Sequence, residues 1–481
     1  MTSLSATNYE DATSASIGRS RSGYPKQDGS SVSAWLEAAQ GDALLDHSSA
    51  PTLPPEADIV IIGSGLSGTL IAHHSIETWP DKKILVLEAR QFCSGATGRN
   101  AGHCKPDQWR GFPKYAEKFG DEQALKILEN EQQTWTQLVS YVRENDVACD
   151  LWVGDTFDVP VTKEAADAAA SAMKRFMAAG GKTEHIKIIN DPKAAAELTL
   201  IKDAKACYAW PASTLNPWKL TAHIMRDNLK KGLGLYTHTE AKSVVPSSGS
   251  PLVWSVQTSR GSIRCSQVVY ATNAYSSAVQ PSLEGLISPY PHICTNVIPL
   301  VPSHQPFPLR NSYGILTNNG FFSINPRLPR GGSILFGGAN PGQAEYTDWL
   351  RPYPEKFIND NQKSFGSISK AVRELALSQL PGWEASMSEA RHYEKGWSGI
   401  IAFSADSVPF VGQIPDLPGQ WISAGHEGHG MARIFTAAPG LVKFMAGGSW
   451  ANTGLPDVFQ ITPDRVSKLR GQPLEILLTR R

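Results

Sequence analysis

Short apolar runs that alternate with a helix-like segment mark the first part of the chain. The stretch DIVIIGSGLSGTLIAHHSI holds a continuous apolar run, Ile59 to Ile62, which is typical of a parallel strand covered on both faces. Residues 69–76 suit a helix, and the stretch KKILVLEAR predicts a second apolar strand that ends at Glu88. The order strand, helix, strand predicts an α/β domain built on a parallel sheet.

Longer patterned segments follow in the middle of the chain. Residues 115–146 predict a long amphipathic helix or a helix pair, and the stretch TKEAADAAASAMKRFMAAGGK predicts a helix closed by Gly180 and Gly181. Residues 320–340 predict two hairpin strands with glycines 331 and 332 in the turn. These segments predict a second, α+β lobe with a mixed sheet that covers the first domain.

Composition narrows the class of protein. A chain of 481 residues exceeds the usual length of one domain, so two lobes are expected. Hydrophobic residues at 41% and charged residues at 19% are typical of a globular protein. Lysine plus arginine equals aspartate plus glutamate at 45 each, so no basic excess favours nucleic acid or an anionic membrane as a partner. No stretch approaches the roughly 18 apolar residues of a membrane span.

Cysteine spacing and the two ends of the chain bear on its location. The cysteines form no C-x-x-C pair, which argues against a zinc site or a disulfide framework and favours a reducing compartment. Residues 1–50 have no apolar signal region, so we expect a disordered or extended leader. The tripeptide SKL at 467–469 is not terminal and gives no peroxisomal address. A cytoplasmic location is expected.

A glycine motif lies between the first predicted strand and its helix. Gly63, Gly65 and Gly68 form G-x-G-x-x-G, and Glu88 follows at the distance, about twenty residues, that a dinucleotide site requires. Gly63 permits the tight turn, Gly65 lets the backbone approach a pyrophosphate, and Gly68 allows the helix to pack closely on the strand. The positive helix N-terminus faces the phosphates, and Glu88 accepts the ribose hydroxyls. A glycine-rich turn without a ligand is the alternative.

The stretch SGATGRNAGHCKPD, residues 94–107, is rich in small residues. Such a loop lets a backbone lie against a flat ligand, and the side chains of Ser94, Thr97 and Arg99 can meet phosphate. His103 and Cys104 have no further Cys or His at ligand spacing, so no metal site is expected. They are also adjacent, and adjacent residues rarely form a nucleophile pair. An active-site role for His103 and a simple backbone hydrogen bond both stay open.

These motifs resemble the D-amino-acid oxidase and glycine oxidase-like family of FAD oxidoreductases. The segment GATGRNAG is similar to the branch that contains the gamma-glutamylputrescine oxidases. Residues 399–412 resemble the family pattern G-x-x-x-x-[ST]-x-D-x-x-P-x-[IV]-G, and residues 425–431 resemble its G-H-x-G-x-G-[MF] turn. Residues 208–245 and 271–275 also resemble family segments. The matching stretches extend over most of residues 57–450.

The resemblance implies a Rossmann-like FAD-binding domain interleaved with a mixed-sheet substrate domain. The FAD-binding domain is expected to be discontinuous, and the substrate domain fills the gaps between its parts. The expected FAD-binding segments are 57–107, 200–280 and 390–450; the substrate segments are 108–199 and 281–389; residues 451–481 form a C-terminal extension.

The resemblance also places the cofactor, which we expect to be FAD bound non-covalently rather than through His103 or Cys104. The small-residue loop runs under the flavin, the 425–431 turn faces its pyrimidine, and Val244 packs near the adenine. A helix dipole at that turn stabilises negative charge on the reduced flavin. The candidate cofactor-binding residues are Gly63, Gly65, Leu66, Ser67, Gly68, Glu88, Ala89, Arg90, Ser94, Gly95, Ala96, Thr97, Arg99, Asn100, Ala101, Gly102, His103, Val244, Ala271, Thr272, Asn273, Gly399, Gly425, His426, Gly428, His429, Gly430 and Met431.

The reaction that the resemblance implies is oxidation of a C–N bond in an amine or amino-acid derivative. Hydride passes to flavin N5, and O2 accepts the electrons and gives H2O2. His103, His426 and Trp397 are the candidate catalytic residues, and a small molecule and O2 are the expected partners, without nucleic acid or membrane.

Two departures from the family pattern affect the substrate. Family amino-acid oxidases often carry a carboxylate-clamping arginine just after the glycine that matches Gly399, where this chain has Ile400. The missing clamp argues against simple α-amino acids unless Arg99, Lys105 or Arg327 replaces it. The strand that holds an oxygen-activating lysine in sarcosine oxidases has none in residues 331–340.

Two alternative functions stay open. The first is FAD-dependent dehydrogenation or oxidative cyclisation of a secondary metabolite. The second is a non-catalytic scaffold that binds a dinucleotide. Bleaching of the flavin by a substrate separates either enzyme from the scaffold, and product analysis separates the two enzymes.

Overall fold

Two β-sheets dominate the molecule. The structure is a computed structural model, and it describes residues 23–248, 252–298, 308–327, 333–383 and 393–470. The first sheet has the strand order β16-β17-β10-β1-β2-β7, and β9 and β8 extend it from β10. Its strands are β1 (Glu56–Ile62), β2 (Ile84–Leu87), β7 (Gly234–Tyr236), β8 (Ala241–Pro246), β9 (Trp254–Thr258), β10 (Gly261–Tyr270), β16 (Phe410–Gln413) and β17 (Gln420–Ala424).

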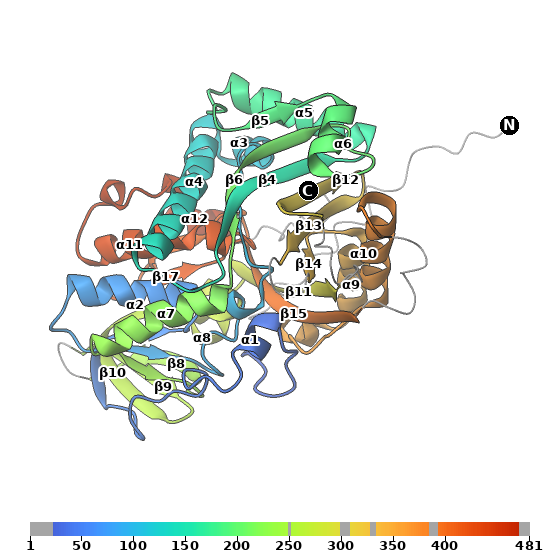
Figure 1. Cartoon of the computed structure of the whole chain (residues 1–481). Helices are drawn as coiled ribbons and strands as arrows, with labels where there is room; N and C mark the ends of the chain where they lie inside the picture. The colour runs from blue at the N-terminus through green and yellow to red at the C-terminus, as the bar shows by residue number, and fades with distance from the viewer. Residues whose placement is uncertain (1–22, 249–251, 299–307, 328–332, 384–392, 471–481) are drawn as a thin grey trace.

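The centre of the first sheet is parallel, as the apolar runs predict. β1 pairs in parallel with both β10 and β2, and β10 pairs in parallel with β17. Ile59, Val60 and Ile61 are almost fully buried, because helices or loops cover both faces of β1. Helix α2 (Leu66–Thr78) packs between α7 (Pro217–Lys230) and α11 (Ile434–Met445), as Figure 1 shows. The predicted α/β domain is confirmed.

The second sheet is mixed and larger. Its order is β15-β11-β14-β13-β12-β4-β6-β3, with β5 on the edge of β6. Only the contact between β12 and β4 is parallel among its described pairs. Its strands are β3 (His103–Cys104), β4 (Trp152–Pro160), β5 (Lys187–Ile189), β6 (Cys207–Thr214), β11 (Ile287–Ile298), β12 (Ser312–Thr317), β13 (Gly320–Pro326), β14 (Ile334–Gly337) and β15 (Tyr393–Ser404).

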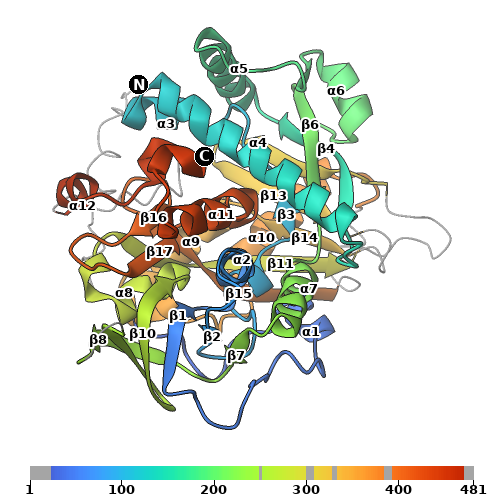
Figure 2. The same cartoon turned by 90° about the vertical axis from the view of Figure 1, so that its left-hand side faces the viewer.

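Helices cover the second sheet in the way that the patterned segments predict. The segment 115–146 is a helix pair, α3 (Phe112–Phe119) and α4 (Asp121–Glu144), separated by Gly120 with φ at +81°. Helix α5 (Lys163–Ala178) begins at Thr162, whose side chain accepts from the amide of Ala165. The remaining helices include α6 (Pro192–Thr199), α8 (Ser276–Val279), α9 (Pro341–Leu350) and α10 (Gly366–Gln379). Figure 2 shows α4 crossing the molecule above α11.

The predicted hairpin in residues 320–340 is present. β13 and β14 pair antiparallel, with Ser323 opposite Gly337 and Pro326 opposite Ile334. The glycines at 331 and 332, predicted to form the turn, lie outside the described residues. Gly337 and Ser323 of this hairpin line the cavity that lies between the two sheets.

Two segments that the sequence assigns to the FAD-binding domain contribute strands to the other sheet. β6 lies in the 200–280 segment and pairs with β4 from Tyr208 to Thr214. β15 lies in the 390–450 segment and pairs antiparallel with β11, from Ile287 opposite Ser404 to Ile298 opposite residue 393. The predicted boundaries differ here because the partners of both strands lie far away in the sequence. The chain therefore crosses between the sheets several times.

The predicted leader is folded over much of its length. Residues 1–22 lie outside the described residues, but helix α1 (Ala34–Ala38) begins at Ser33 and buries Trp35 and Leu36. Leu44 and Leu45 are also buried, so the expectation of a disordered or extended segment is wrong for this part. The apolar residues drive this packing, because they pack into the same core cluster as β1 and α2.

The predicted C-terminal extension is also partly packed. Helix α12 (Pro463–Leu469) buries Val466 and Leu469 against the first sheet. The amide of Ile461 donates to the carbonyl of Val411 on β16. Across the described segments, no helix combines the length and the apolar character that crossing a bilayer requires.

Candidate active site

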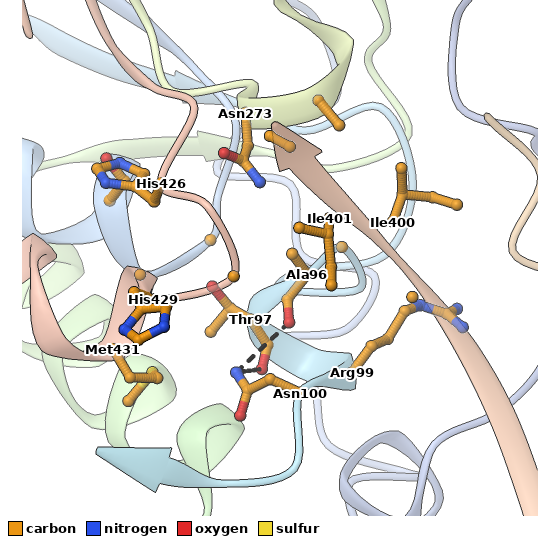
Figure 3. A pocket seen from close by; sticks show the side chains of 18 of the residues that line it. Ala96, Thr97, Arg99, Asn100, Asn273, Ile400, Ile401, His426, His429 and Met431 are labelled. Atoms are coloured by element: carbon orange, nitrogen blue, oxygen red, sulfur yellow. Dashed lines mark hydrogen bonds between the residues drawn. The ribbon is translucent and has the colours of Figure 1, made fainter. Parts of the chain in front are cut away.

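A long cavity of about 420 Å³ runs between the two sheets. Its walls come from the turn after β1, the loop after β2, the segment after β10, and the turn between β17 and α11. The second sheet closes it with residues of β11, β13, β14 and β15. Figure 3 shows part of this cavity, with the glycine turn of His426 and His429 on one side and Ile400 and Ile401 on another.

The glycines after β1 build the tight strand-to-helix turn that their spacing predicts. Gly63 has φ at +109°, and a Cβ there would lie 2.6 Å from the carbonyl oxygen of Ala271. A Cβ on Gly68 would lie 1.9 Å from the carbonyl oxygen of Gly63, so the helix packs on the strand only with glycine here. Gly65 caps α2 without a side-chain hydrogen bond and lines the cavity. The helix N-terminus therefore presents backbone amides to an anion.

Glu88 is fixed at the end of β2 beside this turn. Its Oε2 accepts from the amide of Ser64 at 3.1 Å and from the Ser64 hydroxyl at 2.7 Å, and its Oε1 accepts from the amide of Arg90 at 3.0 Å. Tyr24 and Ala241 line the same end of the cavity. A carboxylate held beside a helix N-terminus fits the ribose and pyrophosphate of a dinucleotide.

Val244 does not lie where the resemblance implies. It is half-buried on β8, pairs with Val256 of β9, and is not among the cavity-lining residues. Glu240 and Ala241 line the cavity instead, because only the beginning of β8 reaches it.

The small-residue loop after β2 is held with its backbone toward the cavity. Nδ2 of Asn100 donates to the carbonyl of Thr97 at 3.0 Å, as drawn in Figure 3, and Oδ1 accepts from the amide of Gly102 at 2.7 Å. Gly102 has φ at +77°, and a Cβ there would lie 2.6 Å from the carbonyl oxygen of Leu215. Oγ1 of Thr97 accepts from the amide of Leu66 at the start of α2. A flat ring can lie against such a fixed, side-chain-poor surface.

Arg99 does not meet a phosphate, and this expectation is corrected. Its buried guanidinium points away from the cavity in Figure 3. It donates to the carbonyls of Ser94 at 2.7 Å, Ser31 at 2.8 Å and Ser398 at 3.0 Å, and it pairs with Asp360 at 3.2 Å. These partners occupy the group, so Arg99 cannot replace the missing carboxylate clamp. It fastens the loop to the N-terminal segment and to β15.

Trp397 has a similar supporting position. It is fully buried on β15, and its Nε1 donates to the carbonyl of Arg99 at 2.8 Å. It is not among the residues that line the cavity. Trp397 therefore holds the loop from behind, and the structure corrects the expectation that it is catalytic.

Three histidines line the cavity in the neutral form. Burial lowers the pKa of His103 to about 3, and the charges of Lys105 and Arg327 add to this effect. Burial lowers the pKa of His426 to about 3 and that of His292 to about 4. Neither ring nitrogen of His103 has a hydrogen-bond partner within the described part of the chain. These neutral imidazoles can accept or donate hydrogen bonds to a ligand in the cavity.

His429 lines the cavity and belongs to a buried ionic network. Its Nδ1 lies 3.3 Å from Oε2 of Glu131, and Nε of Arg433 lies 2.9 Å from Oε1 of the same carboxylate. Arg433 also donates to the hydroxyl of Tyr115 at 2.8 Å. Burial alone raises the pKa of Glu131, but the charges of His429 and Arg433 outweigh it and hold the pKa at about 2. The charged Glu131 fixes the orientation of the His429 ring.

The sequence did not reveal His292 or Glu131 as site residues. His292 sits opposite Gly399 in the pairing of β11 with β15, which joins distant parts of the chain. Glu131 lies on the buried side of α4, where a helical pattern usually carries apolar residues. The pattern around each residue is that of an ordinary strand or helix, so neither carries a local signal.

Two further walls complete the cavity. The wall on β15 is apolar, and the wall near β4 is cationic. Gly399 and Ile400 to Phe403 line the cavity from β15, without an arginine in this stretch. Lys105 and Arg110 line it from the loop after β3, and both lie near the buried carboxylate of Asp158. The two walls differ sharply in charge.

Most of the expected cofactor-binding residues meet at this cavity. Those that line it are Gly63, Gly65, Ser67, Glu88, Ala89, Arg90, Gly95, Ala96, Thr97, Arg99, Asn100, Ala101, His103, Ala271, Thr272, Asn273, Gly399, His426, Gly428, His429, Gly430 and Met431. The expected cofactor-binding residues outside its lining are Leu66, Gly68, Ser94, Gly102, Val244 and Gly425. Among the described residues, no group of three or more His, Cys, Asp or Glu side chains is arranged to hold a metal ion.

Solved structures and curated proteins share this architecture. Glycine oxidase from Geobacillus kaustophilus superposes with a TM-score of 0.63 at 19% identity, over 85% of this chain and 99% of that one. L-amino acid deaminase from Proteus myxofaciens superposes with a TM-score of 0.66 at 16% identity, over 92% and 99%. A probable oxidoreductase, OrdL, of Haemophilus influenzae is 20% identical over 378 residues, which cover 78% of this chain and 80% of the relative.

A family model assigns the chain more firmly than these distant relatives do. The model described as "DAO: FAD dependent oxidoreductase" matches residues 58–443. This range includes the glycine turn after β1, Glu88, the small-residue loop and the turn before α11. The chain therefore belongs to the DAO family of FAD-dependent oxidoreductases.

Proposed function

We propose that the protein oxidises a C–N bond of an amine or amino-acid derivative and uses non-covalently bound FAD as the hydride acceptor. The observation that carries this proposal is the continuous cavity. It joins the dinucleotide loops of the first sheet to the histidine-lined face of the second sheet. A substrate bound at that face is therefore adjacent to the flavin end of the cofactor.

The chain offers a partner for each part of FAD. Glu88 accepts the ribose hydroxyls, the amides at the start of α2 hold the pyrophosphate, and the loop from Gly95 to Gly102 supports the ring. The bound FAD supplies a two-electron acceptor at N5. The turn from Gly425 to Met431 leads into α11, whose positive N-terminus stabilises negative charge on the ring.

The neutral histidines suit a substrate that must react as the free amine. A protonated amine has no lone pair to release as hydride leaves the adjacent carbon. His103 and His292 carry no positive charge near neutral pH, and their ring nitrogens can accept an amine N–H. The apolar residues Ile400 and Ile401 exclude water from the reacting carbon. We assign the chain's contribution to orientation and desolvation, and hydride transfer requires chiefly these.

Non-covalent attachment of FAD is supported by the state of Cys104. Its thiol is fully buried, donates to the carbonyl of Met431 at 3.2 Å, and is outside the cavity lining. Burial raises its pKa, so the nucleophilic thiolate is disfavoured. Acid precipitation of the purified protein tests this: the yellow flavin is expected in the supernatant, and flavin that stays with the pellet would contradict the proposal.

We further assign O2 as the electron acceptor, with H2O2 as the product, and a cytoplasmic location. All six cysteines are free and buried, which is compatible with a reducing compartment. Oxygen uptake and peroxide release during turnover test the acceptor. Reduced flavin that persists in air but is reoxidised by an artificial acceptor would identify a dehydrogenase instead. A fluorescent fusion imaged in the source cells tests the location.

A panel of amines, polyamine conjugates and amino acids tests the proposed reaction. Each is added anaerobically to the FAD-loaded protein, and the carbonyl product is identified after hydrolysis of the imine. The proposal expects one substrate class to bleach the flavin and to yield the matching aldehyde or keto acid. A cyclised product would favour oxidative cyclisation, and a panel that never bleaches the flavin would favour a scaffold.

A further inference from the structure

Two cations that line the cavity share one buried carboxylate. Nζ of Lys105 lies 2.6 Å from Oδ1 of Asp158, and Nε of Arg110 lies 3.4 Å from Oδ2. Asp158 is fully buried on β4. Burial and the charge of Arg110 lower the pKa of Lys105, although Asp158 opposes this effect. One carboxylate therefore faces two positive charges.

A second carboxylate in this region, Asp107, is already engaged. Its Oδ2 accepts from the amide of Gly111 at 2.9 Å, where α3 begins. The positive end of that helix offsets part of the charge of Asp107. The remaining charge of Asp107 still acts on Lys105 and opposes the lowering of its pKa.

Arg110 has unused hydrogen-bond donors that lie inside the protein. Its Nε and NH1 atoms are buried and have no hydrogen-bond partner in the described segments, because the contact with Asp158 is an ion pair of poor hydrogen-bond geometry. A guanidinium offers five donors in a planar fork that matches a carboxylate. Buried donors of this kind usually have partners, so their lack of one points to a ligand.

Aromatic rings hold both cations in place. The guanidinium carbon of Arg110 lies 4.3 Å from the ring centroid of Phe321, and Nζ of Lys105 lies 4.9 Å from that of Trp210. All four residues line the cavity. A ring against one face of the guanidinium leaves its edge, which carries the donors, as the surface open to a ligand.

The opposite wall cannot bind an anion in the same way. From Gly399 to Phe403, β15 presents glycine and apolar side chains to the cavity. The guanidinium of Arg99 is turned away and fully engaged. Of these two walls, only the one that carries Lys105 and Arg110 offers cationic side chains to an anionic group of a substrate.

We propose that the substrate carries a carboxylate besides its amine, and that Arg110, supported by Lys105, binds this carboxylate. The planar fork of the Arg110 guanidinium matches the two oxygens of a carboxylate. The inference rests on the proposed function, because it names the substrate class of the same site. Arg110 thus determines specificity from the loop after β3, on a different wall from Ile400.

Matched pairs of amines test the inference on the FAD-loaded protein. Butylamine is compared with 4-aminobutyrate and with 2-aminopentanoate, and the apparent dissociation constant is taken from the concentration dependence of anaerobic flavin reduction. A carboxylated member is expected to bind roughly 10- to 100-fold more tightly, as a charge-assisted fork contact contributes. Arg110→Ala is expected to erase this difference, and Arg110→Lys to restore only part of it.

The exposed Arg226 on α7, which pairs with Asp42 outside the cavity, provides the matched control. Arg226→Ala is expected to keep the wild-type ratio between the members of each pair. Equal binding of both members by the wild-type protein would overturn the inference, and so would an Arg110→Ala ratio equal to the wild-type ratio. If Arg110→Ala does not fold, the ratios for Arg110→Lys and Arg110→Gln decide in the same way.

Calorimetry with butyrate separates this inference from the proposed function. Butyrate has no amine and cannot be oxidised, so its binding is measured without turnover. Binding to the wild-type protein that Arg110→Ala abolishes supports the carboxylate site even if no amine bleaches the flavin. An absence of butyrate binding overturns the site, while bleaching of the flavin by uncharged amines would still support the proposed function.

Discussion

At the scale of single residues, the glycines of the turn after β1 have different physical roles. Gly68 is required by packing, because a Cβ there would lie 1.9 Å from the carbonyl oxygen of Gly63. Gly65 has φ at −65°, which any residue adopts, and a Cβ there would meet only Oγ1 of Thr97, at 3.1 Å. Gly68 therefore supports the fold, and Gly65 keeps space open in the cavity.

This difference predicts opposite effects for two alanine substitutions. Gly68→Ala is expected to lower the free energy of unfolding by about 1–3 kcal/mol, as overpacking does. Gly65→Ala is expected to leave the apoprotein close to wild type but to weaken FAD binding, because the methyl group occupies the approach to the pyrophosphate. Urea unfolding of the apoproteins and FAD titrations measure both effects. Equal losses of stability in the two variants would contradict the assignment.

The buried histidines predict how stability depends on pH. Burial lowers the pKa of His292 from 6.5 to about 4, so between these values the unfolded chain binds a proton that the folded chain does not. The stabilisation is complete above pH 6.5 and is lost as the pH falls toward 4, by about 1.4 kcal/mol per pH unit for this residue. His292→Gln is expected to flatten the slope of unfolding free energy against pH in this window. A variant slope equal to that of the wild type would contradict the prediction.

Residues whose roles depend on local spacing could be predicted from the sequence, and those whose side chains depend on distant partners could not. Gly63, Gly65 and Glu88 act through one strand-turn-helix unit, so their spacing suffices. The direction of Arg99 depends on Ser31, Ser398 and Asp360, which no local pattern brings together. The sequence therefore predicted a loop that does line the cavity, but it did not predict the direction of the arginine side chain.

At the scale of elements, α4 and the segment that leads into α11 are joined by a buried ion pair. Glu131 and Arg433 are both fully buried and lie 2.9 Å apart. Arg433 directly precedes α11, and His429 lies in the turn just before it. The pair thus connects a helix of the second lobe to the turn that we propose faces the flavin.

Breaking this pair is expected to be costly. Glu131→Gln leaves the charge of Arg433 buried without its counter-ion and is expected to lower the free energy of unfolding by about 3–5 kcal/mol. Glu131→Leu combined with Arg433→Met is expected to recover part of that loss, because neither charge of the pair remains, although the buried Glu427 then loses the nearby charge of Arg433. Urea unfolding measures each change. As a control, Asp167→Asn removes the exposed contact with Lys163 and is expected to change stability by less than about 1 kcal/mol.

If Glu131→Gln were no more destabilising than the exposed control, the account of this network would be wrong.

The helices could be predicted from the sequence, but the sheet to which some strands belong could not. The amphipathic pattern identified α3, α4 and α5, because each buries a face set by its own sequence. The pattern of apolar residues did not place β6 and β15 in the second sheet, because the sequence of a strand does not specify its partner strand.

At the scale of the whole molecule, the chain passes repeatedly between the two sheets, and the cavity lies between them. The interleaved path predicts that both sheets unfold together rather than as separate domains. In the proposed binding mode FAD contacts walls from both sheets, so its binding is expected to stabilise the whole molecule. At a free FAD concentration 100 times Kd the gain is about 2.7 kcal/mol.

Calorimetric unfolding with and without FAD measures this coupling. One transition that moves to higher temperature with added FAD is expected. Two transitions, of which FAD shifts only one, would contradict the coupling between the sheets.

The most direct test of the central claim is the visible spectrum of the FAD-loaded protein, recorded anaerobically as an amine substrate is added. We predict that the flavin band bleaches, and that deuterium on the carbon next to nitrogen slows the bleaching because that C–H bond breaks. Protein that takes up no FAD would contradict the assignment of both glycine turns. Bound flavin that no amine reduces would contradict the proposed oxidation of a C–N bond.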